Sequence, residues 1–191
     1  MNKAVIKSVT PKLCEKIASG ECAILLSKTK PKLNAPFKCY IYCSQNQFMA
    51  HKKNGDFWFA KRNSCIQPID SIQFSGKVIG EFICDKVETY DYDYDGVDID
   101  DDTLLKTKLD REEINIYAKG KTLYGWQISD LKIYDKTKEL SEFKKAGFLT
   151  EEQWLSDLYP NTHCHYEAWA KRFEIASPPR SLYYVEEVHN E

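Results

Sequence analysis

The sequence contains no apolar run close to the roughly 20 residues that a membrane-spanning helix needs, which excludes a transmembrane protein. Residues 1–7 likewise lack the uninterrupted apolar stretch that forms the core of a secretory signal. We therefore expect a cytoplasmic protein that does not contact a membrane.

Disulfide and zinc-binding frameworks are also missing. The seven cysteines are an odd number, they are scattered along 191 residues, and no Cys-x-x-Cys pair occurs. In a protein without an export signal, this pattern predicts free thiols. The run His163-Cys164-His165 is a weak zinc signal, because three adjacent positions on a helix cannot all face one metal ion. No cofactor is expected from these residues.

The net charge of −2 conceals two blocks of opposite sign. Residues 1–80 hold 13 Lys and Arg against 4 Asp and Glu, whereas residues 81–118 hold 4 against 13. A basic first part and an acidic middle predict either an anionic partner, such as nucleic acid, or pairing of the two blocks within the molecule. Clustering of solvated charges without further meaning is the alternative.

Strands dominate the expected secondary structure. Apolar periodicity predicts strands over 4–9, 22–26, 37–43, 57–60, 77–84, 123–134 and 182–188. Thr10-Pro11 and two capping boxes, beginning at Asp110 and Thr150, predict short helices, and one more is expected over 161–173. Without regular strand–helix alternation, we expect an α+β fold built around a small mixed β-barrel. Residues 1–191 are predicted to form one domain, with an acidic insertion over about 88–108 and a helical insertion over about 148–176.

Several segments, in order along the chain, resemble the ASCH domain of the PUA-like superfamily. They include Glu15-Lys-Ile-Ala-Ser-Gly20, residues 28–32, Pro36-Phe-Lys-Cys-Tyr-Ile-Tyr-Cys43 and residues 76–82. Residues 124–135, 138–143, 178–181 and 184–187 resemble the variant common in Firmicutes and their phages. The resemblance covers roughly residues 3–90, 109–145 and 178–188. It implies a PUA-like barrel whose cleft, near the first helix, meets RNA or modified nucleosides.

Some members of that family deacetylate acetylated cytidine with the motif Gly-x-Lys-x-x-Glu-x-Arg, which supplies a base, a proton-transferring carboxylate and an orienting arginine. The corresponding positions here hold Gly20, Cys22, Leu25 and Ser27, so all three charged groups are replaced. We therefore expect a cleft without catalytic residues, which makes the protein a non-catalytic module that binds RNA or a modified nucleotide. A nucleoside amidohydrolase is the alternative.

Basic and aromatic side chains are the candidates for nucleic-acid contacts. Basic groups neutralise phosphates and aromatic rings stack on unpaired bases. Positions 57–59 are all aromatic and are flanked by cations, although aromatic residues at strand spacing also fit a protein core. The predicted nucleic-acid-binding residues are Lys28, Lys30, Lys32, Lys52, Lys53, Lys61, Arg62, Trp126, Ser129 and Arg180.

The acidic segment 91–102 has the spacing of a calcium-binding loop, with Asp91, Asp93, Asp95 and Asp102 as candidate ligands. It lacks the flanking amphipathic helix pair, so a solvated acidic insertion is the simpler interpretation. The same segment could bind a basic protein partner, which gives a third alternative function, a phage-encoded interaction module. No oligomeric state is predicted.

Overall fold

The structure, a computed structural model, describes residues 3–45, 48–54, 56–61, 72–146, 174–175 and 177–187. Its elements in chain order are β1 (Lys3–Val9), α1 (Pro11–Ala18), β2 (Ile24–Ser27), β3 (Phe37–Cys43), β4 (Phe48–Lys53), β5 (Asp56–Lys61), β6 (Ile72–Gln73), β7 (Val78–Tyr90), β8 (Tyr92–Asp93), β9 (Gly96–Val97), α2 (Asp101–Thr107), α3 (Arg111–Ala118), β10 (Leu123–Lys138), a 3-10 turn (Leu140–Glu142) and β11 (Leu182–Glu186). These elements confirm the α+β class.

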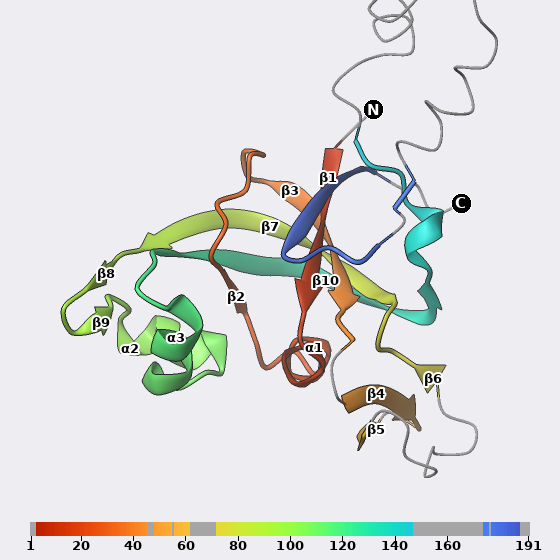
Figure 1. The fold of residues 1–191 in the computed structure, drawn as a ribbon, viewed down its shortest axis with the longest axis horizontal. Helices are drawn as coiled ribbons and strands as arrows, with labels where there is room; N and C mark the ends of the chain where they lie inside the picture. The colour runs from red at the N-terminus through yellow and green to blue at the C-terminus, as the bar shows by residue number, and fades with distance from the viewer. Residues whose placement is uncertain are drawn as a thin grey trace, which may run out of the picture.

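Six strands form one sheet in the order β11-β1-β3-β7-β10-β2 (Figure 1). Strands β1 and β3 are parallel, and the other neighbours are antiparallel. The strand predicted over 57–60 is part of β5, and β5 and β6 both pair with β4 in a separate small sheet. Among the described strands, β11 and β2 are the two edges and no pairing joins them. The expected barrel is therefore an open sheet in this part of the chain.

The sheet is strongly curled. Its register shifts at three places between β7 and β10 and once between β3 and β7, and such irregularities increase the local bend and twist. In Figure 1, β1 and β2 cross in front of the long strands β7 and β10. Although β3 and β7 separate β1 from β10 in the sheet, the ammonium of Lys7 on β1 lies 5.8 Å from the ring centroid of Trp126 on β10.

Both faces of the central strands are buried. On β1, Val5 and Val9 belong to the core inside the curl, whereas Ala4 and Ile6 pack on its outside with Val185 of β11. Strand β3 divides in the same way, because alternate side chains of a strand point to opposite faces. The five described cysteines have free, buried thiols, as the sequence predicts.

The acidic insertion differs from the solvated segment expected from its composition. The predicted residues 88–108 include β8, β9 and α2, with Asp100 accepting a hydrogen bond from the backbone N–H of Thr103 as the N-cap of α2. The helix α3 follows directly, and from here on we call residues 88–118 the insertion. Ile114 of α3 is fully buried in a cluster that also contains Ile24 and Leu26 of β2. The insertion is therefore the cover of the outer face of β2, which would otherwise expose its apolar side chains.

Part of the predicted organisation lies outside the described residues. This applies to the helices expected over 150–158 and 161–173, hence to nearly all of the helical insertion, and to the run at 163–165. Within the residues that the structure does describe, no helix is both long and apolar enough to cross a membrane.

Candidate functional site

A pocket of about 220 Å³ opens at the seam between the end of β1 and the edge strand β2. We call it the seam pocket. Residues 7–9 of β1, the first turns of α1, two residues of β2 and part of α3 form its walls. The apolar wall residues are Val9, Leu13, Leu25, Leu26, Leu109 and Tyr117. Such a mostly apolar pocket with a few polar groups is the usual form of a small-molecule site.

Lys7 is the most unusual residue of the seam pocket. The residue is part of the pocket wall, yet only 3% of it is exposed. Its ammonium donates a hydrogen bond to the hydroxyl of Ser181 (3.2 Å) and lies over the ring of Trp126. Both partners are neutral, and among the described residues no carboxylate forms an ion pair with Lys7. Burial accordingly lowers the pKa of Lys7 to about 8, while the nearby Cys39 opposes the shift.

Lys7 is not among the site residues predicted from the sequence, although one signal was available. It stands between Val5 and Val9 on the face of β1 that points into the curl. A lysine that interrupts an inward-facing apolar row cannot reach solvent easily, and such a residue is a candidate for function. Its partner Ser181, which is half-buried, directly follows the predicted Arg180 in the chain.

Two further cations, Lys12 and Lys16 of α1, also line the seam pocket, and both have polar partners. Lys12 forms an exposed ion pair with Glu113 of α3 at 3.3 Å. The ammonium of Lys16 donates to the backbone carbonyl of Lys108, just after α2. These contacts connect α1 to the insertion and place two lysines at the pocket, in addition to the deeper Lys7.

The family-motif positions occupy the strand and turn after α1. Gly20 follows α1 with a φ of +76°, which favours glycine. Burial raises the pKa of the Cys22 thiol to about 11, so this thiol is an inert core group at neutral pH. Ser27 is fully buried and bonds to the carbonyl of Thr29. Of the four positions, only Leu25 lines the seam pocket.

The predicted nucleic-acid-binding residues do not form one cluster. Lys28 lies with its ammonium 4.8 Å from the ring centroid of Tyr117, beside the seam pocket. Lys30, Lys32 and Arg180 are exposed, and Ser129 donates to the carbonyl of Ile83. Lys52 and Lys53 lie on β4 in the separate small sheet. Lys61 is in β5, where only the backbone is described, and Arg62 lies outside the described residues.

Trp126 is a core residue and not an exposed stacking platform. It is fully buried and packs edge-to-face against Phe37, with ring centroids 5.5 Å apart. Its indole N–H has no hydrogen-bond partner among the described atoms. Buried polar groups of this kind are uncommon, because an unmade hydrogen bond costs about 1–3 kcal/mol.

Three of the four carboxylates proposed as calcium ligands, those of Asp91, Asp93 and Asp102, have other partners. Asp91 accepts from the hydroxyl of Thr122, Asp93 accepts from the backbone N–H of Asp95, and Asp102 pairs with Lys106 within α2. In the part of the chain that the structure describes, no group of three or more His, Cys, Asp and Glu side chains is placed to hold a metal ion.

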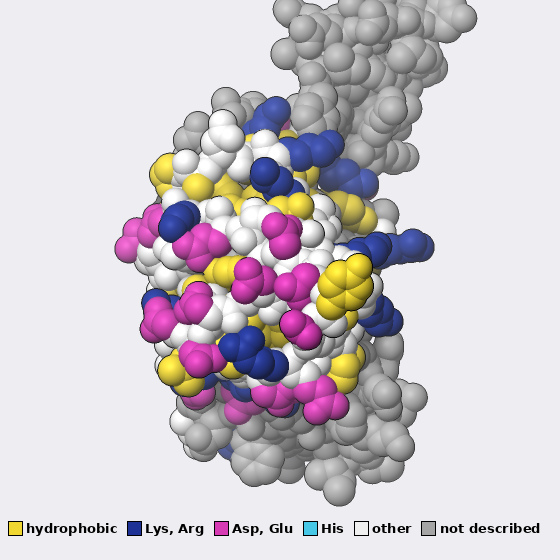
Figure 2. Space-filling view, turned by 90° about the vertical axis from the view of Figure 1, so that its left-hand side faces the viewer, with side chains coloured by type: hydrophobic (Ala, Val, Ile, Leu, Met, Phe, Trp, Pro, Cys, Tyr) yellow, Lys and Arg dark blue, Asp and Glu magenta, His cyan; other side chains and the backbone are white. Residues whose placement is uncertain are grey.

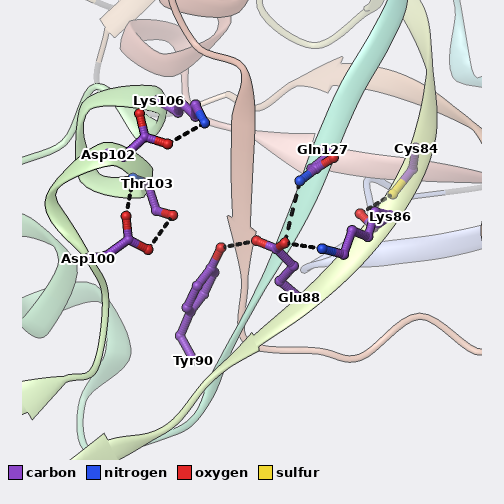
Figure 3. A network of polar contacts seen from close by, with 9 residues as sticks. All are labelled: Cys84, Lys86, Glu88, Tyr90, Asp100, Asp102, Thr103, Lys106 and Gln127. Atoms are coloured by element: carbon purple, nitrogen blue, oxygen red, sulfur yellow. Dashed lines mark hydrogen bonds and ion pairs between the residues drawn. The ribbon is translucent and has the colours of Figure 1, made fainter.

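Figure 3 shows the polar contacts around Glu88, at the junction of β7 and β10 with the insertion. Its carboxylate accepts hydrogen bonds from Lys86 and Tyr90, both at 2.6 Å, and from Gln127 at 3.5 Å. The bond from Lys86 is the main reason that the pKa of Glu88 lies below its usual range. Burial, followed by the bond to Glu88, raises the pKa of Tyr90. The bond from Gln127 joins β10 to β7, while Asp100, drawn in the same view, accepts hydrogen bonds from the neutral Thr103.

A second cavity has a cation with acidic partners. It measures about 500 Å³ and is lined by Lys3, Lys38 and Glu187 together with residues of the 33–37 segment. The ammonium of Lys38 lies 2.9 Å from Glu187 and 3.8 Å from Glu81. The seam pocket therefore differs from this cavity in having a deep cation that lacks an acidic partner within the described residues.

Acidic side chains are spread over the face on which the insertion lies (Figure 2). The five exposed large hydrophobic residues found in the described part of the chain also belong to the insertion: Tyr92, Tyr94, Leu105, Ile116 and Tyr117. An acidic surface repels polyanions.

Comparison with known proteins gives a distant structural likeness. No family profile and no curated protein matches the sequence. The chain is similar to a crystal structure of ASCH from Zymomonas mobilis at 14% identity and a TM-score of 0.48, covering 94% of this chain and 85% of that one. Crystal structures of two point mutants of the same protein, one Tyr-to-Phe and one Ser-to-Ala, give the same identity and TM-score.

Proposed function

We propose that this protein is a cytoplasmic, non-catalytic binding module for RNA or a nucleotide, of the ASCH and PUA-like type, and that its ligand occupies the seam pocket. The observation that carries the proposal is Lys7, a buried cation in a pocket with only neutral partners in the described structure. A buried charge without a counter-ion is costly, and an anionic ligand removes that cost. The sequence resemblance to the variant common in Firmicutes and phages supports the same function.

The remaining walls of the seam pocket suit a nucleotide. Lys16 supplies positive charge, and the charge of Lys12 is offset in part by Glu113 in the same wall. Leu25, Leu26 and Tyr117 supply apolar surface for a base or a sugar. The volume lies below the roughly 300 Å³ at which sites for drug-sized ligands begin. The pocket therefore fits one nucleotide unit, and any further RNA would lie along the neighbouring lysines 28, 30 and 32.

The test is fluorescence-polarisation binding of a short single-stranded RNA at low and moderate salt. Replacing Lys12 and Lys16 together by Ala is expected to weaken binding and to flatten the slope of log K against log salt by about 1.4, since each phosphate contact on a single strand contributes about 0.7. The control removes the same charge elsewhere, with Lys132→Ala and Lys136→Ala on exposed positions of β10. Equal effects of the two double variants, or no binding at low salt, would contradict the proposal.

One distance favours the hydrolase as a second candidate. The amine of Lys7 lies 3.2 Å from the hydroxyl of Ser181, within reach for proton transfer. With a pKa of about 8, Lys7 is partly neutral at pH 8 and able to accept that proton. Release of acetate from acetylated cytidine, lost in Ser181→Ala, would support this candidate. Absence of acetate release from the unmodified protein would exclude it for that substrate.

A further inference from the structure

Lys7 and Lys38 are both partly or fully buried cations, and they differ in the groups that contact their ammonium ions. Lys38 lines the second cavity and has two carboxylates within 4 Å. Lys7 is more deeply buried, and its described partners are a hydroxyl and an aromatic ring. An ammonium in such surroundings is stabilised by a ligand that brings its own negative charge, because the local environment screens the attraction weakly.

The first turn of α1 adds donors to the same pocket. Thr10, Lys12 and Leu13 line it, and the side chain of the N-cap residue Thr10 makes no capping hydrogen bond. Pro11 has no N–H, so the backbone donors that face this end of the helix are those of the next residues. Helix N-termini favour anions, and phosphate is a frequent ligand there. The helix end and the buried Lys7 are independent observations that meet in one pocket.

The depth of Lys7 restricts how a phosphate can reach it. With 3% of the residue exposed, Lys7 is not part of an open groove along which a continuous strand could run. An internal phosphodiester must leave the pocket in both directions, whereas a terminal phosphate needs only one exit. A phosphomonoester also carries close to two negative charges at pH 7, because its second pKa is about 6.

We propose that the seam pocket binds a phosphate monoester, the terminal phosphate of an RNA or of a free nucleotide, with Lys7 as its charge partner. This inference rests on the proposed function and specifies the ligand group. Lys7 and the first turn of α1 contact the phosphate, and the apolar walls contact the adjoining nucleoside.

Binding should therefore depend on pH. The titratable groups around Lys7 are the thiol of Cys39, whose pKa is held well above its ordinary value by burial, and Lys12, Lys16 and Glu113 in the pocket wall. Since the pKa of Lys7 in the free protein is about 8, the phosphate-dependent part of the affinity is expected to fall by about tenfold per pH unit above pH 8.

The experiment compares RNAs of one short sequence, labelled at the 3′ end, with a 5′-phosphate or a 5′-hydroxyl. The 5′-phosphorylated RNA is expected to bind at least about tenfold more tightly. Lys7→Met should remove that advantage, so that the two RNAs bind with equal affinity, whereas Lys12→Ala should weaken both RNAs similarly and keep the difference between them. Calorimetry with a nucleoside 5′-monophosphate, the nucleoside and inorganic phosphate distinguishes a free nucleotide from an RNA end.

The outcomes separate the two proposals. Equal binding of the two RNAs, with salt-dependent affinity retained, would overturn the monoester inference and leave RNA binding intact. Binding of the nucleoside monophosphate alone would support the inference and identify the free nucleotide as the source. No binding of any RNA or nucleotide would overturn both. The comparison of the two RNAs on the unmodified protein needs no variant, so it stands even if Lys7→Met folds poorly.

Discussion

Replacing Lys7 by Met is expected to stabilise the folded protein at pH 7 by about 3 kcal/mol. Burial lowers the pKa of Lys7 from 10.5 to about 8, and each pKa unit corresponds to about 1.4 kcal/mol of differential interaction. Methionine retains an unbranched apolar chain of similar length and removes the buried charge, and replacing a buried charge by an apolar group is often stabilising. Urea unfolding of both proteins at pH 7 measures the difference.

The sign of this effect depends on pH. Below pH 8, Lys7 is protonated in both the folded and the unfolded state, and the folded state bears the full cost of the buried charge. Between pH 8 and 10.5 the folded state releases the proton while the unfolded state keeps it, so the free energy of unfolding rises with pH. The advantage of Lys7→Met should therefore shrink across that window.

Lys12→Met is the matched control for Lys7→Met. The Lys12 side chain is 69% exposed, and surface substitutions of this kind change stability by only about 0.5 kcal/mol. Lys7→Met could instead destabilise the protein at pH 7, or its stabilising effect could stay constant between pH 8 and 10.5. Either result would show that burying the Lys7 charge does not destabilise the folded state. The basis for ligand binding at this residue would then be lost. A binding residue is expected to show two effects together: Lys7→Met stabilises the folded protein and abolishes phosphate binding.

Ile114→Ala is expected to lower the free energy of unfolding by about 3 kcal/mol. Ile114 of α3 is 0% exposed and packs with Ile24 and Leu26 of β2. Truncating a buried Ile removes apolar contacts and leaves a cavity, and such changes cost about 2–5 kcal/mol. Chemical denaturation monitored by circular dichroism measures the loss.

The same helix offers a matched control at Ile116, which is 63% exposed. Ile116→Ala removes the same atoms and introduces the same change in helix propensity, so it is expected to change stability by less than about 0.5 kcal/mol. If the insertion were solvated, both substitutions would change the free energy of unfolding only slightly. Similar losses at Ile114 and Ile116 would contradict the burial of α3 against β2. A deletion within 91–118 is expected to destabilise the protein for the same reason, because it would expose the apolar outer face of β2.

Local pattern determined much of the secondary structure. The sequence predicts a strand over 37–43, and β3 is found there, because its residues are apolar on both faces and the strand is buried on both. The capping box at Asp110 correctly predicts the start of α3, since Asp110 and Glu113 exchange hydrogen bonds across the first turn. Thr10-Pro11 likewise marks the start of α1. Each of these patterns depends only on residues that are close together in the sequence, so it can be recognised without the tertiary structure.

The sequence alone therefore determined the α+β class, the approximate strands and the positions of α1 and α3. Tertiary structure decided what those elements enclose. The curl of the sheet brings Lys7 of β1 over Trp126 of β10, and Ser181 joins them from a segment 174 residues away. It also turns the acidic insertion into the cover of β2. Burial depends on neighbours distant in sequence, so composition identified the charges but could not show that one lysine would be buried without a carboxylate partner among the described residues.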